Sequence, residues 1–180
     1  MKAIRILVCC ALVLCLSFSL CSARNLQYIM DSTDHESELY LDTDSIRLSE
    51  FGTPHYGLVF RIFDMKSFYD RQAFYYMLTQ NGSFEQYNLL SSHDWSYIVD
   101  IYEISVPDKS IRLICEEFYN SNDDLIFPMR FGDPQYKLII NHDKYSRITR
   151  AVGDYYMNHA EYIHSLPYYD FESDSYKEMP

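Results

Sequence analysis

Residues 95–104, WSYIVDIYEI, and residues 110–119, SIRLICEEFY, decide the fold predicted for this chain. Both stretches are rich in β-branched and aromatic residues, which strands favour. The Pro-Asp-Lys sequence at 107–109 lies between them and has the composition of a tight turn. We therefore expect the two stretches to be antiparallel neighbours in a sheet.

Alternation along each strand predicts which side chains share a face of this sheet. Along residues 56–64, one face is expected to hold Tyr56, Leu58, Phe60 and Ile62, and the other Val59, Arg61 and Phe63. In the second strand of the pair, Ile111, Leu113 and Cys115 are expected on one face. Further extended segments are expected at residues 39–42, 46–48, 125–131 and 136–140, with Pro128 marking an edge or a bulge.

Two helices are predicted to cover the sheet. Residues 70–80 begin at a capping Asp70 and end before Asn81-Gly82. Residues 143–164 form a longer helix that ends before Pro167, with an apolar stripe made of Ile148, Val152, Tyr155, Tyr156, His159 and Ile163. The fold class is therefore expected to be α+β: an antiparallel sheet of about five strands covered by one short and one longer C-terminal helix.

Composition limits the classes of protein to consider. The chain has 180 residues, 48% of them hydrophobic, and a formal net charge of −11. This length suits one domain, the apolar content excludes a disordered chain, and the acidic balance argues against nucleic acid as a partner. We expect a flexible approach at residues 24–38, a single domain at 39–166, and an acidic tail at 167–180 that is disordered at least in part.

Residues 1–23 have the order of a secretory signal peptide: Lys2 and Arg5, an apolar run, then small residues. Cleavage is expected after Ala23, so the protein should be exported to the periplasm, the cell surface or the medium. Two alternatives stay open. Residues 4–21 reach the short limit of a membrane span, so the segment could remain as an anchor. A bacterial lipid anchor is the other alternative. Against it, a leucine precedes both Cys15 and Cys21, where lipoprotein processing requires a small residue.

Four of the five cysteines lie within residues 1–23, which leaves Cys115 in the rest of the chain. A single cysteine forms no internal disulfide. We expect Cys115 to be a buried free thiol in an apolar strand rather than a catalytic one.

Local motifs for catalysis or metal binding are missing from the sequence. There is no G-x-S-x-G elbow, no glycine-rich phosphate loop and no H-E-x-x-H, and the six histidines are scattered. Asp42 and Asp44 do not continue into an EF-hand, so Asp42 and Ser45 are expected to form a turn instead. No cofactor and no metal site is predicted.

Three basic residues near the start of the helix at 143–164 form a candidate interaction strip: Lys144, Arg147 and Arg150. Positive charge at this end of a helix opposes its dipole, so an acidic group of the tail or of a partner could offset it. A solvated helix face is the alternative explanation.

The segment Tyr40-Leu41-Asp42-Thr43-Asp44-Ser45-Ile46 resembles one found early in bacterial surface-adhesin protein E-like domains. The resemblance also includes the strand pattern over residues 39–131, and it extends to uncharacterised exported bacterial proteins. It implies a small antiparallel sheet with helical cover outside the cytoplasm, and for some members adhesion to host extracellular proteins. Ser105 and Val106 stand where family members often carry a cysteine, so no binding residues are transferred to this chain. The family-like turn segment consists of Tyr40, Asp42, Thr43, Ser45 and Ile46.

These features favour an exported, non-enzymatic domain that binds an extracellular or envelope protein, with a membrane contacted only through an uncleaved signal segment. Two alternatives remain. One is an exported enzyme whose site combines distant residues such as His93, Asp94 and Glu103. The other is a structural component of the envelope that self-associates through its sheet edges; the oligomeric state is not predicted.

Overall fold

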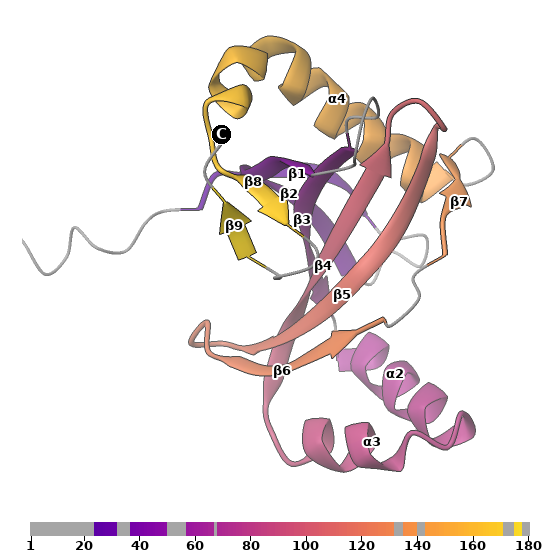
Figure 1. Ribbon diagram of the computed structural model, residues 1–180. Helices are drawn as coiled ribbons and strands as arrows, with labels where there is room; N and C mark the ends of the chain where they lie inside the picture. The colour runs from indigo at the N-terminus through magenta and orange to yellow at the C-terminus, as the bar shows by residue number, and fades with distance from the viewer. Residues whose placement is uncertain are drawn as a thin grey trace, which may run out of the picture.

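The computed structural model describes residues 24–31, 37–49, 57–66, 68–131, 135–139, 143–170 and 175–177. Within these ranges the chain forms one nine-stranded sheet and three helices (Figure 1). The strands are β1 (Leu26–Asp31), β2 (Ser37–Ser49), β3 (Gly57–Lys66), β4 (Trp95–Ser105), β5 (Ser110–Asn120), β6 (Leu125–Arg130), β7 (Lys137–Leu138), β8 (Tyr168–Asp170) and β9 (Ser175–Lys177). The helices are α2 (Phe68–Gln80), α3 (Phe84–Ser91) and α4 (Asp143–His164).

The strand order is β6-β5-β4-β3-β2-β8-β9, with β1 also paired to β2 and β7 also paired to β5. All pairings are antiparallel except that of β2 with β8. The α+β class and the antiparallel sheet are thus confirmed, including the predicted hairpin, in which Ser105 pairs with Ser110.

The expected count of about five strands is wrong, because short strands lie in segments predicted to be irregular. β1 lies inside the expected flexible approach at 24–38, and β8 and β9 lie inside the expected tail at 167–180. β1 has one buried residue, Met30, so its own sequence carries little strand pattern. Pairing with the long strand β2 decides its conformation. The predicted signal segment, residues 1–23, lies outside the described residues.

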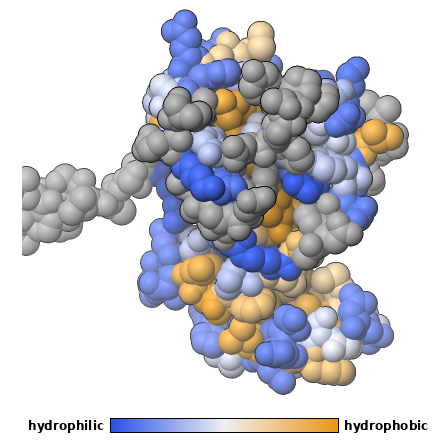
Figure 2. Space-filling model, viewed as in Figure 1, coloured by the Kyte–Doolittle hydropathy of each residue, from blue (hydrophilic) through white to orange (hydrophobic). Residues whose placement is uncertain are grey.

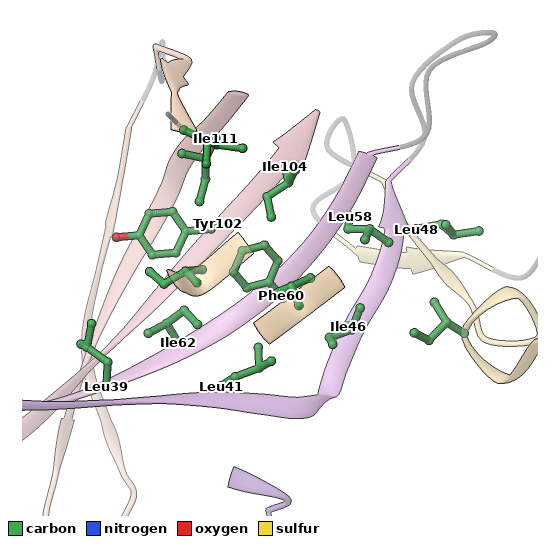
Figure 3. Close-up of a cluster of buried hydrophobic side chains, with 14 of the residues drawn as sticks. Leu39, Leu41, Ile46, Leu48, Leu58, Phe60, Ile62, Tyr102, Ile104 and Ile111 are labelled. Carbon is green, nitrogen blue, oxygen red and sulfur yellow. The ribbon is translucent and has the colours of Figure 1, made fainter. Parts of the chain in front are cut away.

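The main core lies between one face of the sheet and α4. Leu58, Phe60 and Ile62 of β3 point to this face, as predicted, and meet Ile148, Val152 and Ile163 of α4. Figure 3 shows the sheet side chains of this cluster: Leu39, Leu41, Ile46, Leu48, Leu58, Phe60, Ile62, Tyr102, Ile104 and Ile111.

A second core lies at the other end of the sheet, where α2 and α3 pack together (Figure 1). Trp95 and Phe118 meet there edge to face, with ring centroids 5.3 Å apart, and Leu78 and Leu90 of the two helices close over them. Ile98 in this core and Tyr102 in the main core lie an even number of residues apart on β4, so both cores use the same face of that strand.

The helix predictions hold in part. The bounds predicted for α4, 143–164, match the structure, but His159 has non-helical dihedral angles (φ −132°, ψ 21°) and an exposed side chain, so it does not belong to the buried stripe. α2 ends at Gln80 as expected, followed by Gly82 with φ 71°, but it begins at Phe68, so the predicted start at a capping Asp70 is wrong. α3 was not predicted; it is eight residues long and buries one of them, Leu90, so its periodic signal is weak.

The predicted face of Cys115 is wrong because β5 contains a bulge. Ile101 pairs with Cys115 and Tyr102 with Leu113, which leaves Ile114 as an extra residue between them. An extra residue in one strand reverses the alternation beyond it. Leu113 therefore packs toward α4, while Cys115 is buried on the opposite face with Val59 and Ile101.

Candidate binding pocket

An apolar cavity of about 410 Å³ lies between α4 and the ends of β3 and β4. Its volume falls within the range of small-molecule sites in proteins. The lining residues come from three parts of the chain: Leu58, Ile104, Ser105, Val106 and Lys109 from the sheet and its hairpin, Ile139, and Thr149, Val152, Gly153, Tyr156 and Met157 from α4.

The α4 wall of the pocket follows from helical spacing. Residues at positions i, i+3, i+4, i+7 and i+8 lie on one face of a helix, and residues 149, 152, 153, 156 and 157 have this spacing. Gly153 stands in the middle of that face. A Cβ atom added to Gly153 would meet nothing within 4 Å, so the missing side chain contributes to the open space.

The hairpin between β4 and β5 forms the opposite wall. Lys109 ends the turn with φ 48°, in the left-handed region where glycine or asparagine is usual. Its amide donates to the Val106 carbonyl at 3.4 Å, and its own carbonyl accepts from the Ile139 amide at 3.1 Å. These bonds hold the backbone of Lys109 beside the pocket.

Polar groups are sparse around the cavity. Lys109 is the charged side chain among the lining residues that the structure describes. The Ser105 hydroxyl donates to Asp108 at 2.6 Å, and the Tyr156 hydroxyl lies 2.7 Å from Nε2 of His164. The Thr149 hydroxyl is buried and has no hydrogen-bond partner within the described part of the chain. A buried hydroxyl in this state gains free energy from any polar group that reaches it.

A smaller hollow of about 210 Å³ is lined by Tyr102, Ile111, Leu113, Phe131, Gln135, Lys137 and Tyr145. Nζ of Lys137 donates to the Tyr145 hydroxyl at 3.5 Å, so its ammonium group already forms a hydrogen bond within the hollow. The cavity beside Gly153 is larger, which makes it the stronger candidate for a ligand site.

The opposite face of the sheet carries a buried polar network centred on Glu103. This carboxylate, fully buried, accepts hydrogen bonds from Ser49 Oγ at 2.8 Å, Arg112 Nε at 2.6 Å and the Tyr136 hydroxyl at 2.9 Å. The Arg112 guanidinium also lies over the Tyr136 ring, 4.7 Å from its centroid. Burial, followed by the neighbouring Glu103 carboxylate, raises the pKa of Tyr136 well above its ordinary value. With its donors arranged in this way, Glu103 ties four segments of the chain together.

The same face carries a row of aromatic side chains that crosses β1 to β5. Tyr28 meets Tyr40 edge to face at 5.7 Å, Phe63 stacks on Tyr97 at 5.6 Å, and Tyr97 stacks on Tyr119 at 5.3 Å. Tyr40 and Phe63 are opposite each other in the β2–β3 register, which completes the row. Phe63 and Tyr97 are buried, so the centre of this row is structural rather than an open platform.

The tyrosine hydroxyls of this row donate to carboxylates. Tyr97 donates to Asp123 at 2.6 Å and Tyr119 to Glu117 at 2.8 Å. Burial, reinforced by the Glu117 carboxylate, raises the pKa of Tyr119 to about 12. Burial also raises the pKa of Tyr97, with a further contribution from the bond to Asp123. Both phenols therefore hold their protons more tightly in the folded protein than in an unfolded chain.

The family-like segment forms a wide bulge within β2, where the sequence had suggested two strands separated by a turn. Asp42 pairs with Arg61 and Arg47 with Val59, so residues 43–46 loop out of the ladder. The expected side-chain bonds are present: Asp42 Oδ1 accepts from the Asp44 amide at 3.1 Å, and Ser45 Oγ donates to the Asp42 carbonyl at 2.6 Å. Ser45 Oγ also accepts from the Arg61 amide, which fills the gap in the ladder.

The other members of this segment have separate roles. Thr43 Oγ1 donates to the Asn25 carbonyl at 3.1 Å, the Tyr40 hydroxyl donates to Glu38, and Ile46 is fully buried in the main core. Burial raises the pKa of Asp42. The segment as a whole shapes β2 and does not line the pocket.

Two of the three residues in the basic strip at the start of α4 lie close to acidic residues of the same chain. Nζ of Lys144 lies 3.7 Å from Asp100 Oδ2 on the sheet, and Nε of Arg147 lies 2.9 Å from Asp143 Oδ2, one turn earlier on the helix. Arg150 is exposed. The strip is therefore a mixed-charge surface, and none of its members lines the pocket.

The dispersed residues named for an enzymatic site are not brought together. His93 and Asp94 are exposed just before β4, where Asp94 lies 3.4 Å from Arg71, whereas Glu103 is buried near the other end of β4. Glu103 is eight positions after Trp95 along the strand, which is about 26 Å at the usual rise. Among the described residues, no group of three or more His, Cys, Asp or Glu side chains is placed to hold a metal ion.

The described helices include none that is both long enough and apolar enough to cross a membrane. Comparison with known proteins found no matching family model, no matching curated protein and no matching solved structure. The resemblance to surface-adhesin protein E-like domains therefore stays a prediction.

The pocket residues were not identified from the sequence. Gly153, in the middle of a strongly periodic helix, is the one visible sign: a glycine there weakens the helix, so an advantage elsewhere is expected. Lys109 carried no comparable sign, because its left-handed backbone conformation depends on the hairpin and on Ile139.

Proposed function

We propose that this chain is an exported, non-enzymatic binding domain and that the cavity between α4 and the β4–β5 hairpin is its binding site. One observation carries the proposal: an apolar cavity of about 410 Å³ whose α4 wall is opened by Gly153. Unfilled apolar space normally lowers stability, because its lining loses packing contacts. An apolar group of a ligand would restore those contacts. The signal-like order of residues 1–23 supports the exported part of the proposal.

Titration with a neutral, environment-sensitive dye, N-phenyl-1-naphthylamine, tests this function. We expect saturable fluorescence enhancement with the folded protein. Gly153→Leu should abolish it, because the leucine side chain would occupy the cavity. Gly153→Ala is the matched control and should retain binding, since a single methyl group leaves most of the space open. Dye binding that is absent in the unaltered protein, or equal in the leucine variant, would refute the proposed site.

A protein-binding function of the adhesin type is the second candidate, and a separate surface favours it. Apolar side chains gather on the outside of the α2–α3 pair (Figure 2). Tyr76 is 67% exposed, Phe84 60% and Met77 45%. Exposed aromatic residues in a cluster are typical of protein interfaces. Loss of a captured host matrix protein on Phe84→Ser, with the dye site intact, would support this second function.

A further inference from the structure

We infer that the ligand of this pocket is a free single-chain amphiphile, with a hydrocarbon chain in the cavity and an anionic head group at Lys109. The inference rests on the proposed function, since it names the class of molecule that the same site takes.

Cavity size argues for a hydrocarbon chain. An engineered apolar cavity of about 150 Å³ is large enough for benzene. The present cavity, at about 410 Å³, is more than twice that volume. A single aromatic or aliphatic side chain from a partner protein would leave much of it empty, whereas a flexible chain can extend through it between Leu58 and Ile104 on one side and Val152 on the other.

Charge at the rim argues for an anion. Lys109 supplies the charged side chain among the described lining residues, and its aliphatic stem can follow the apolar wall while the ammonium group stays at the solvent boundary. Asp108, the neighbouring acid, accepts a hydrogen bond from Ser105 and is not part of the lining. A neutral ligand would make no use of the ammonium group, and a cationic one would be repelled by it.

The backbone conformation at Lys109 sets where its side chain starts beside the pocket. Its φ of 48° is unfavourable for a residue with a long side chain, and glycine would fit the turn better. A left-handed residue is usual at the end of a hairpin turn, and Asp123 in the β5–β6 turn has the same conformation with φ 65°. The hydrogen bond from the Ile139 amide to the Lys109 carbonyl holds the backbone of Lys109 in place. The turn thus places the Lys109 side chain, with its ammonium group, at the pocket.

The lining itself is almost entirely apolar, and the Thr149 hydroxyl is buried beneath its surface, so the polar contact for a head group comes from Lys109 at the rim. A carboxylate, sulfate or phosphate head group has several acceptor oxygens and can form charge-assisted hydrogen bonds with an ammonium group. An alcohol head group offers one oxygen and no charge. The polar groups of this site therefore match an anionic head better than a neutral one.

Displacement of the bound dye by decanoate, 1-nonanol and nonyltrimethylammonium, which share a nine-carbon chain, tests the inference at pH 8 and low ionic strength. We expect decanoate to bind about threefold to fivefold more tightly than nonanol, within the range of an exposed ion pair, and the cation to bind most weakly. Affinity within the carboxylate series should rise about fourfold per added methylene until the cavity is full. Equal affinities for the three head groups would overturn the inference and leave the proposed function standing.

Variants at Lys109 separate the charge from the fold. Lys109→Gln should abolish the preference for decanoate over nonanol, measured as the ratio of the two affinities within the variant. Lys109→Gly should lose the same preference and raise the thermal midpoint, because glycine relieves the left-handed backbone. Lys144→Gln, which removes a cation outside the lining, is the control and should keep the preference. A preference that survives in both Lys109 variants would contradict the assignment.

Vesicles of dioleoylphosphatidylglycerol distinguish a free amphiphile from a lipid bilayer. We expect the protein to stay in the supernatant when the vesicles are sedimented, while decanoate still displaces the dye. Sedimentation with the vesicles would overturn the assignment to a free molecule.

Discussion

Glu103 shows how one buried residue can tie separate segments of the sheet together. Its carboxylate accepts from Ser49 on β2, Arg112 on β5 and Tyr136 beyond β6. The sequence indicates Glu103 only as a member of a dispersed enzymatic site, because its partners lie up to 54 residues away. Chain-distant contacts of this kind follow from strand register, which no local pattern specifies.

Replacing Glu103 by glutamine should destabilise the protein by about 2–4 kcal/mol, because it leaves the Arg112 guanidinium, 18% exposed, without its carboxylate. Urea unfolding monitored by circular dichroism measures this loss. Arg147→Gln is the matched control: it breaks an exposed pair with Asp143 and should change the free energy of unfolding by about 0.5 kcal/mol or less. Equal effects of the two substitutions would show that the Glu103 network does not stabilise the fold.

Gly57 of β3 leaves room for the Ser49 side chain of β2 to reach Glu103 of β4. A Cβ atom at Gly57 would overlap the Ser49 hydroxyl and lie 2.8 Å from Oε1 of Glu103. Gly57→Ala should therefore destabilise the protein by about 1–3 kcal/mol. In the Ser49→Ala background the same substitution should be less harmful, because the overlapping oxygen is gone. Additive free energies of unfolding in this double-mutant cycle would argue against the overlap.

Among the elements, α4 was the easiest to predict from the sequence. Its role in forming the pocket was the hardest to predict. Residues 143–164 show clear helical spacing, and the structure confirms both bounds. What the spacing did not show is the gap in the stripe at Gly153, because a hydrophobic stripe predicts contact with the sheet and not where that contact fails. α3 and the strands β1, β8 and β9 were missed since tertiary pairing, rather than local periodicity, decides them.

The helix tolerates a larger residue at Gly153. Gly153→Ala should stabilise the protein by about 0.5–1 kcal/mol, since alanine is the better helix former and its Cβ meets no neighbour. Gly82→Ala is the opposite case: its φ of 71° ends α2, so alanine there should destabilise by a comparable amount. Thermal unfolding of both variants checks the contrast. A destabilised Gly153→Ala would mean that the helix face is packed and the cavity closed.

For the whole molecule, the raised tyrosine pKa values predict a loss of stability in alkali. Burial holds the pKa of Tyr119 at about 12 and that of Tyr102 well above its ordinary value, whereas an unfolded tyrosine has a pKa of about 10. The unfolded chain therefore releases these protons first as the pH rises. The contribution of both phenols is fully present below pH 10 and is lost as the pH rises through the folded-state values.

Urea unfolding between pH 8 and pH 11.5 measures this dependence. The free energy of unfolding should fall with a steeper slope above pH 10, and Tyr119→Phe should make that slope shallower. Tyr162→Phe, at a half-exposed position on α4, serves as the control. A slope unchanged by Tyr119→Phe would show that this phenol titrates alike in the folded and unfolded states.

At this scale the sheet architecture was largely predictable, because the 95–119 hairpin and the alternation in 56–64 carry a clear strand pattern. The pocket was not predictable, because it lies where α4, the hairpin turn and Ile139 meet. No sequence pattern encodes a space between elements. The extracellular location and the resemblance to adhesin-like domains stay predictions.

Methyl NMR during a titration with 1-decanol tests the pocket most directly, because each core has its own aliphatic reporters. We predict saturable shifts for Leu58, Ile104, Ile139 and Val152, with the signals of Leu78 and Leu90 under α2 and α3 unchanged. Shifts confined to Leu78 and Leu90, or no saturable shift at any of these methyl groups, would contradict the proposal that this cavity binds an apolar ligand.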